Sequence, residues 1–264
     1  MKLCFSTLGC AERNLSEILS LSEKFNIPYL EIRGVGGVLD NALIEDFREE
    51  TATKTKKAMA ESDVTPIVLG TSCMLHTEES VALALIEARA AISVAKRLSI
   101  PYIRVFGNNL IGRREDCIRR VTEGIAALCD MAKDTGVSVL LEVHGDFNTV
   151  ETLSPILDAL KARNEFGLIW DVAHSHTAYG ESWEPFYECI RPYIRHVHIK
   201  DKRTEGGLTM LGEGDVPIAA IVQRMLKDGY DGCFSLEWER LWHPCLADIE
   251  VALARFTSYF SALS

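Results

Sequence analysis

The sequence predicts an α/β protein that forms a single (β/α)8 TIM barrel over residues 1–264. Short runs rich in β-forming residues alternate with longer stretches of helical periodicity, which is the pattern of βαβ units and a parallel sheet. Eight such pairs can be counted, as many as a closed barrel of this kind requires. The chain has 264 residues, 47% of them hydrophobic, which suits the size and the core of one such barrel.

In the first half of the chain, each β-rich run is followed by helical periodicity. The turn signals FNIP (25–28) and LSIP (98–101) each lead into a run. The strand and helix pairs are, in order, LCFST (3–7) with 14–25, YLEIRG (29–34) with 40–62, TPIVLG (65–70) with 78–98, and PYIRVFG (101–107) with 114–134.

The second half continues the alternation, with DTGV (134–137) and KDGYDG (227–232) as turn signals before strands. Its pairs are VSVLLEVHG (137–145) with 150–163, FGLIWDVAH (166–174) with 184–191, RHVHIKD (195–201) with 216–228, and CFSLEWE (233–239) with 246–262. An open, doubly wound sheet is the alternative architecture. It is disfavoured because no GxGxxG motif follows the first strand.

The composition of the chain disfavours some classes of binding partner. The formal net charge of −10 disfavours nucleic acid, which is bound mainly through clustered Lys and Arg. The eight cysteines form no CxxC pair, so we expect reduced, mostly buried thiols. The N-terminal apolar run is too short for a secretory signal, and no stretch approaches the roughly 18 apolar residues of a membrane span. These features predict a cytoplasmic protein with no nucleic-acid or membrane partner.

Four runs of the second half each carry an acidic or imidazole side chain near the C-terminal end. These residues are Glu142, Asp171, His198 and Glu237. The C-terminal ends of barrel strands meet at one face, where the active sites of this fold lie. Carboxylates gathered there repel one another unless a cation or bound protons compensate. The sequence therefore predicts one divalent metal ion per chain.

The alternation of side chains along a strand supports a common direction for these groups. The polar residues expected to line the top of the barrel from the fifth, seventh and eighth runs are Ser138, Glu142, His144, His196, His198, Lys200, Ser235, Glu237 and Glu239. Spacing alone leaves His196 and Glu239 as neighbouring candidates. Carboxylates with an imidazole suit several metals, so we expect Mn2+ first, with Mg2+, Co2+ and Zn2+ also compatible.

Residues 137–240 resemble the sugar phosphate isomerase/epimerase superfamily of xylose-isomerase-like TIM barrels. The resemblance lies in the motifs LLEVHG, WDVAHSH, HVHIKDKR, LGEGDVP and SLEWE, whereas the first half matches mainly by its order of strands and helices. The superfamily includes ketose 3-epimerases, hydroxypyruvate isomerase, inosose dehydratase, 3-dehydroshikimate dehydratases and, more distantly, endonuclease IV.

The resemblance implies roles for individual residues. It makes Glu142, Asp171, His198 and Glu237 the metal ligands, because the second His of HVHIKD matches a ligand. It makes His174 a contact of the substrate, and it assigns acid and base catalysis to Glu142 and Glu237. On strands separated around the ring, these two carboxylates would lie on opposite faces of a planar intermediate, the arrangement that inverts one carbon centre.

The expected reaction is isomerisation or epimerisation of a small sugar, sugar phosphate or related polyhydroxy carbonyl compound. Removal of the α-proton would give an enediolate that the metal stabilises. A dehydratase acting on an inosose or a 3-dehydroshikimate-like compound shares this first step and then expels a β-hydroxyl. The ligand set does not separate the two reactions.

Residues for substrate binding are predicted from their position near the ends of strands. His174, Lys200 and Arg203 are candidates for contacts to hydroxyl or phosphate groups, and Arg104 for a contact to substrate or to a barrel carboxylate. The loop GGLTMLGEGDVP offers backbone N–H groups as an anion site. Trp242 follows the eighth strand and is placed to cover the site.

Two other classes of function remain as alternatives. An endonuclease IV-like phosphodiesterase is disfavoured by the acidic balance and by a ligand set for one metal rather than three. A barrel that binds sugar or metal without catalysis would show no exchange of substrate protons with solvent. A homodimer is compatible with the sequence, although no apolar stripe marks its interface.

Overall fold

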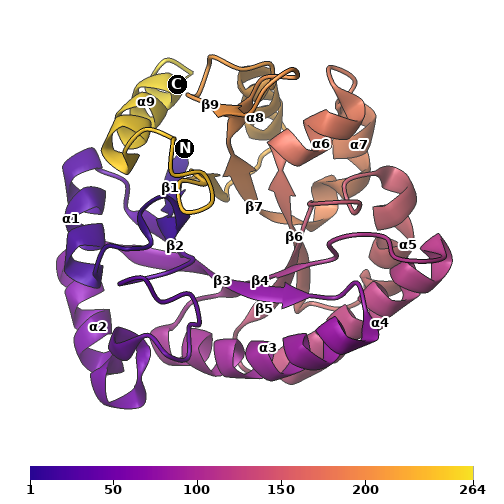
Figure 1. Cartoon of the computed structure of the whole chain (residues 1–264), viewed down its shortest axis with the longest axis horizontal. Helices are drawn as coiled ribbons and strands as arrows, with labels where there is room; N and C mark the ends of the chain where they lie inside the picture. Colours follow the sequence, from indigo (N-terminus) through magenta and orange to yellow (C-terminus); the bar gives the residue numbers. More distant parts are fainter. Residues whose placement is uncertain (264) are drawn as a thin grey trace.

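The computed structural model describes residues 1–263, and these form a closed barrel of parallel strands (Figure 1). The strands are β1 (Lys2–Ser6), β2 (Tyr29–Ile32), β3 (Thr65–Met74), β4 (Tyr102–Phe106), β5 (Ser138–Glu142), β6 (Phe166–Asp171), β7 (Ile194–Ile199) and β10 (Cys233–Leu236). Their order around the barrel is β1-β10-β7-β6-β5-β4-β3-β2, and β1 pairs with both β2 and β10. The barrel prediction is confirmed, and the open sheet is excluded.

Helices surround the strands on the outside of the barrel (Figure 1). The α-helices are α1 (Leu15–Phe25), α2 (Glu49–Glu61), α3 (Glu78–Leu98), α4 (Arg114–Ala132), α5 (Val150–Leu160), α6 (Val172–Tyr179), α7 (Glu184–Ile190), α8 (Ile218–Lys227) and α9 (Ile249–Ser261). Short 3-10 turns are η1 (Thr7–Cys10), η2 (Glu45–Phe47) and η3 (Arg191–Tyr193), and β8 (Asp201–Lys202) pairs antiparallel with β9 (Leu208–Thr209).

Several elements differ in their bounds from the sequence prediction, and in two segments the type of structure differs as well. The helix expected over 40–62 is shorter, because residues 40–44 are not helical and η2 precedes α2. The strand expected over 166–174 ends at Asp171, where the helix α6 begins. The side chain of Asp171 accepts hydrogen bonds from the backbone N–H groups of Ala173 and His174, and this cap turns the chain out of the sheet.

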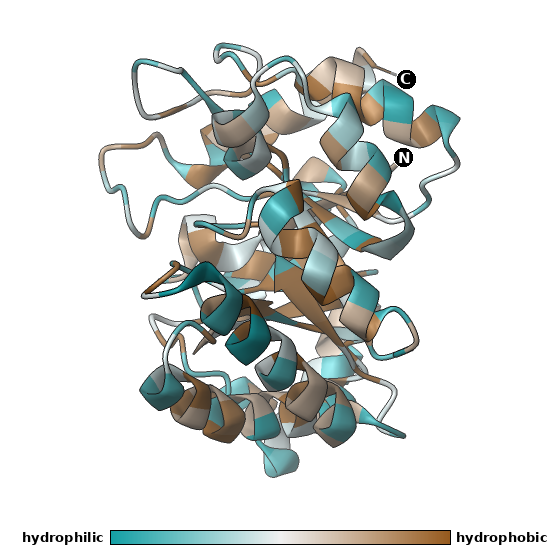
Figure 2. Ribbon diagram, turned by 90° about the vertical axis from the view of Figure 1, so that its right-hand side faces the viewer, coloured by the Kyte–Doolittle hydropathy of each residue, from teal (hydrophilic) through white to brown (hydrophobic). Residues whose placement is uncertain are grey.

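The hydrophobic core lies mainly between the strands and the surrounding helices, and the central strands are the most hydrophobic part of the ribbon (Figure 2). A separate, smaller cluster contains Val68, Leu140 and Ile169. Leu140 and Ile169 stand two residues before Glu142 and Asp171 on their strands, so they share the inward direction of these carboxylates. The apolar floor of the barrel interior therefore lies beneath its polar top.

Strand register brings polar groups to the same level of the barrel. Asp171 of β6 pairs with His198 of β7, and His198 pairs in turn with Ser235 of β10. A register shift between Leu168 and Ile169 accompanies the pairing of β6 with β7. The backbone N–H of Glu237 continues the ladder past the end of β10 by donating to Ile199 O at 3.1 Å.

The cysteines are mostly buried, as the sequence predicts. All eight cysteines are free thiols, and six of them are buried. Among residues 1–263, none of the helices combines the length and the apolar character needed to pass through a lipid bilayer.

Candidate active site

The four carboxylate and imidazole groups expected at the ends of strands converge in the structure. Glu142, Asp171, His198 and Glu237 are all buried, and one donor atom from each lies within 4.8 Å of the others. His198 Nδ1 stands 3.5 Å from Glu142 Oε1 and 3.5 Å from Glu237 Oε2. Closure of the barrel thus gathers residues that lie up to 95 positions apart in the chain.

The donor atoms of this group fit a divalent metal ion. His198 Nδ1 is buried and has no hydrogen-bond partner, and Asp171 Oδ2 is buried with an ion pair to Lys200 but no aligned hydrogen bond. An unpartnered polar atom is costly in a protein interior, and both atoms are placed to coordinate a cation. Oxygen atoms with one imidazole nitrogen are compatible with Mn2+, Mg2+, Co2+ and Zn2+.

Glu31 is the main residue of the site that the sequence interpretation missed. It belongs to β2, is fully buried, and accepts hydrogen bonds from His198 Nε2 at 3.0 Å and from Ser235 Oγ at 3.1 Å. Its contact with His196 Nε2 is 2.9 Å, so His196 lies beside this carboxylate rather than in the four-residue group. Because Nε2–H of His198 donates to this carboxylate, Nδ1 of the neutral ring keeps a lone pair that can bind a metal ion.

Two cationic side chains lie against the carboxylates. Arg104 donates to Glu142 Oε2 at 3.0 Å and lies 3.8 Å from Glu237 Oε1. Lys200 Nζ lies 2.7 Å from both Asp171 Oδ2 and Glu237 Oε2, although only the contact to Glu237 has the alignment of a hydrogen bond. These residues place positive charge around a group of carboxylates that would otherwise repel one another.

The charged groups of the site shift the pKa values of its two glutamates. Burial and the charge of Glu237 raise the pKa of Glu142, but Arg104 and His198 outweigh them and lower that pKa to about 2. Burial likewise opposes ionisation of Glu237, yet His198 and Lys200 bring the pKa of Glu237 well below its usual range. Both carboxylates are therefore ionised at neutral pH, which is the form that binds a metal ion.

A cavity of about 140 Å3 opens beside this group. Its walls are formed by Leu8, Arg33, Arg104, Phe106, Glu142, His144, Lys200, Glu237, Glu239 and Trp242. Pockets for drug-sized ligands measure roughly 300–1,000 Å3, so this one suits a small molecule. Trp242 lines the cavity, as expected for a residue that covers the site, and Glu239 forms an ion pair with Lys200.

The remaining residues predicted to bind substrate occupy different surroundings. His174 Nε2 lies 4.0 Å from Asp171 Oδ2, and its ring packs against that of His144 with 3.9 Å between centroids and a tilt of 44°. Burial lowers the pKa of His174 to about 4, which makes it a neutral imidazole at neutral pH. Arg203 is exposed, points its Nε to Glu213 O at 3.4 Å, and does not line the cavity.

The loop expected to bind an anion through its backbone is already engaged by the chain. Asp201 Oδ2 accepts hydrogen bonds from the backbone N–H groups of Gly212 at 2.8 Å and Gly214 at 3.0 Å, and Asp201 Oδ1 accepts one from Val216 at 3.3 Å. An ideal Cβ on Gly214 would lie 2.2 Å from Asp201 Oδ1, so the glycine is needed for this close approach. The prediction of a free anion site here is wrong because Asp201 supplies the anion.

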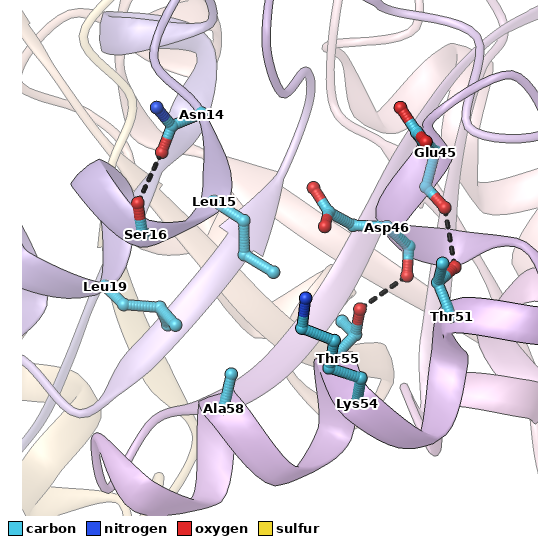
Figure 3. Close-up of a pocket in the computed structure, with 10 residues that line it drawn as sticks. All are labelled: Asn14, Leu15, Ser16, Leu19, Glu45, Asp46, Thr51, Lys54, Thr55 and Ala58. Carbon is cyan, nitrogen blue, oxygen red and sulfur yellow. Dashed lines mark hydrogen bonds between the residues drawn. The ribbon is translucent and has the colours of Figure 1, made fainter.

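A larger cavity, about 390 Å3, lies between α1 and α2 (Figure 3). There the hydroxyls of Thr51 and Thr55 donate to backbone carbonyls of Glu45 and Asp46, which ties η2 to α2. Its charged side chains are partly or fully exposed, unlike those at the top of the barrel. We therefore place the candidate active site in the barrel.

Comparisons with known proteins agree with this architecture. A family model described as xylose isomerase-like TIM barrel matches residues 23–255. The zinc-bound IolI protein superimposes with a TM-score of 0.80 and 22% identity, covering 98% of this chain and 96% of IolI. The 3-keto-D-glucoside 4-epimerase YcjR of Escherichia coli superimposes with a TM-score of 0.76 and 14% identity, covering 99% of both chains.

Among curated sequences, the inosose dehydratase of Serratia proteamaculans is 25% identical over 150 residues. This match covers 49% of the present chain and 50% of the dehydratase. The similarity thus extends over about half the length of that relative.

Proposed function

Because the chain belongs to the xylose isomerase-like TIM barrel family, we propose that it is a metal-dependent isomerase or epimerase. Its substrate would be a small sugar, sugar phosphate or related polyhydroxy carbonyl compound. The observation that carries the proposal is the placement of two ionised carboxylates, Glu142 and Glu237, each with an oxygen 3.5 Å from His198 Nδ1.

The metal site of the proposal consists of Glu142, Asp171, His198 and Glu237. A divalent ion held there would supply the positive charge that lowers the barrier to α-proton removal and stabilises an enediolate. Zinc in the structurally similar IolI protein supports a metal in this family, and Mn2+ remains our first expectation for this chain.

The protein side of the mechanism is the transfer of a proton. Glu142 and Glu237 come from strands separated by β6 and β7 in the barrel, so they approach the cavity from different directions. One carboxylate would accept the α-proton and later release it to solvent. The other would first take up a proton from solvent and then deliver it to the intermediate. Lys200 and Arg104 would hold these carboxylates in place through their ion pairs.

The apolar residues of the cavity wall would support the reaction by excluding water. Leu8, Phe106 and Trp242 bring apolar surface next to the charged groups. Such surface excludes water and thereby strengthens the electrostatic interactions within the site. His174, which packs against His144, would contact a hydroxyl of the substrate as a neutral imidazole.

A dehydratase is the second candidate, and the match to inosose dehydratase favours it. Incubation of the Mn2+-loaded protein with ketoses and keto-cyclitols in deuterated water separates the two. Epimerisation or isomerisation exchanges the carbon-bound proton without loss of water, whereas dehydration produces a conjugated chromophore. Binding without any exchange would contradict both candidates.

Substitution tests the roles of the two glutamates. Glu142→Gln and Glu237→Gln remove the proton acceptor but keep the side-chain size, so we expect turnover to fall roughly a hundredfold or more. Glu115→Gln, at an exposed position on α4, is the matched control and should leave the rate unchanged. A near-normal rate in either site variant removes that residue from the acid and base roles.

A further inference from the structure

Arg33 is a buried cation of the cavity for which the described residues provide no direct ion pair. It follows directly after β2, its residue is 6% exposed, and it lines the same cavity as Glu142 and Glu237. Its guanidinium donates to neutral acceptors, Ser72 Oγ at 2.8 Å and Leu39 O at 3.5 Å. Within residues 1–263, no carboxylate oxygen lies within 4.0 Å of its nitrogen atoms.

The other two cations of the cavity are paired. Arg104 forms an ion pair with Glu142 at 3.0 Å, and Lys200 forms ion pairs with Asp171 and Glu237 at 2.7 Å. Arg33 therefore differs from its neighbours because its donors on the cavity wall contact no carboxylate of the described residues, and Glu87, Glu237 and Glu142 act on it only from a longer distance. A buried charge without a partner is costly, and a bound anion would offset that cost.

The pKa of Arg33 agrees with its buried position beside Arg104. Burial and the charge of Arg104 lower the pKa of Arg33 to about 10. The side chain still carries its charge at neutral pH, because the lowered pKa remains well above 7. The positive charge is thus present but less stable than in water.

Space for two adjacent guanidinium groups depends on Gly70 of β3. An ideal Cβ at this position would lie 2.8 Å from Arg33 Cδ and 3.3 Å from Arg104 Nη2. Any larger residue would push the two arginines out of their positions over the strand. The backbone is held in place there because Asn41 Nδ2 donates to Gly70 O at 2.8 Å.

We propose that Arg33 binds an oxyanion of the substrate, a carboxylate or a phosphate monoester, at the wall of the cavity. A planar guanidinium can offer two parallel N–H groups to such an anion. The group would select acidic polyhydroxy carbonyl compounds over neutral sugars of the same size. This inference rests on the proposed function, because it assigns a substrate class to the same site.

Anion binding to the Mn2+-loaded protein tests the inference by calorimetry. The probes are inorganic phosphate for the phosphate monoester and acetate for the carboxylate. We expect the wild type to bind at least one probe and Arg33→Met to weaken that binding about tenfold or more. The preferred probe identifies which oxyanion the site accepts.

Two further variants make the result specific. Arg119→Met removes an exposed charge from α4 and should bind the probes as the wild type does. Arg33→Lys keeps the charge without the planar fork, so its affinity should lie between those of wild type and Arg33→Met. Thermal unfolding of each variant establishes that the folded protein was titrated.

The inference is overturned if the wild type binds neither probe, or if Arg33→Met binds them as tightly as the wild type. Titration of the same samples with Mn2+ separates this outcome from failure of the proposed function. Normal metal binding without a role for Arg33 overturns only the anion assignment. If metal is not bound at all, the proposed function fails, and the phosphate and acetate titrations of the metal-free protein still decide the role of Arg33.

Discussion

His198 occupies the centre of the candidate site because both of its ring nitrogens have defined surroundings. Nε2 contacts Glu31 at 3.0 Å, and Nδ1 faces Glu142 and Glu237 at 3.5 Å. Glu31 in turn accepts a hydrogen bond from Ser235 and lies 2.9 Å from His196 Nε2. This chain of contacts fixes the ring orientation that metal binding requires.

Glu31→Gln tests the positioning role of this carboxylate. The amide has only one oxygen acceptor where the carboxylate faces two imidazoles, so the orientation of His198 should be weakened. We expect the affinity for Mn2+ or Zn2+ to fall about 10- to 100-fold, measured by calorimetry. Ser235→Ala, which removes one hydrogen bond to Glu31, should have a smaller effect. Unchanged metal affinity in Glu31→Gln would show that Glu31 only fills space.

The same alternation rule that placed Glu142 and His198 inward also applies to the run YLEIRG. There Glu31 and Arg33 share one face, and Leu30 and Ile32 share the other. The signal for both missed residues was therefore in the sequence. Their contacts were not predictable, because His198 lies 167 positions after Glu31 and meets it only when the barrel closes.

Among the elements, the loop that follows β5 carries a backbone constraint next to the cavity. Gly145 has φ of +58°, and an ideal Cβ there would lie 2.5 Å from Asn108 O. His144 and Phe147 form an isolated bridge across this glycine, and His144 lines the cavity. The glycine thus holds a turn that positions His144.

Gly145→Ala should destabilise the protein more than Gly136→Ala. Gly136 also has a positive φ, +80°, but an added Cβ would meet nothing within 4 Å, so its cost is about 1–2 kcal/mol from conformation alone. The clash with Asn108 should add about 1–3 kcal/mol for Gly145→Ala. Chemical denaturation measures both free energies of unfolding, and equal losses would contradict the steric account.

Sequence patterns predicted the elements well where periodicity was long and uniform. The helix α3 (Glu78–Leu98) has the bounds expected for it, and all eight barrel strands appear at the expected places. The helix α6 was missed because VAH after Asp171 continues the apolar character of the strand, whereas the cap made by Asp171 is a contact of its side chain. The occupied backbone amides around Asp201 were missed for the same reason.

On the scale of the whole molecule, closure of the barrel brings the candidate site together. The pairing of β1 with β10 completes the ring. The register of β6, β7 and β10 puts Asp171, His198 and Ser235 side by side, and Glu237 follows two residues after Ser235. A cation bound only by this folded arrangement would stabilise it, by about 2.7 kcal/mol at a concentration 100 times the Kd. Metal binding and barrel stability should therefore rise and fall together.

The most direct measurement is the stoichiometry and affinity of metal binding by the purified protein after removal of divalent ions with a chelator. Mass spectrometry and calorimetry with Mn2+ and Zn2+ should give about one ion per chain, with a higher unfolding temperature in the loaded protein. The double variant Asp171→Asn with Glu237→Gln should remain folded and bind none. A folded wild type that binds no divalent ion, or a double variant that binds as the wild type does, would contradict the convergence of these four residues on one metal.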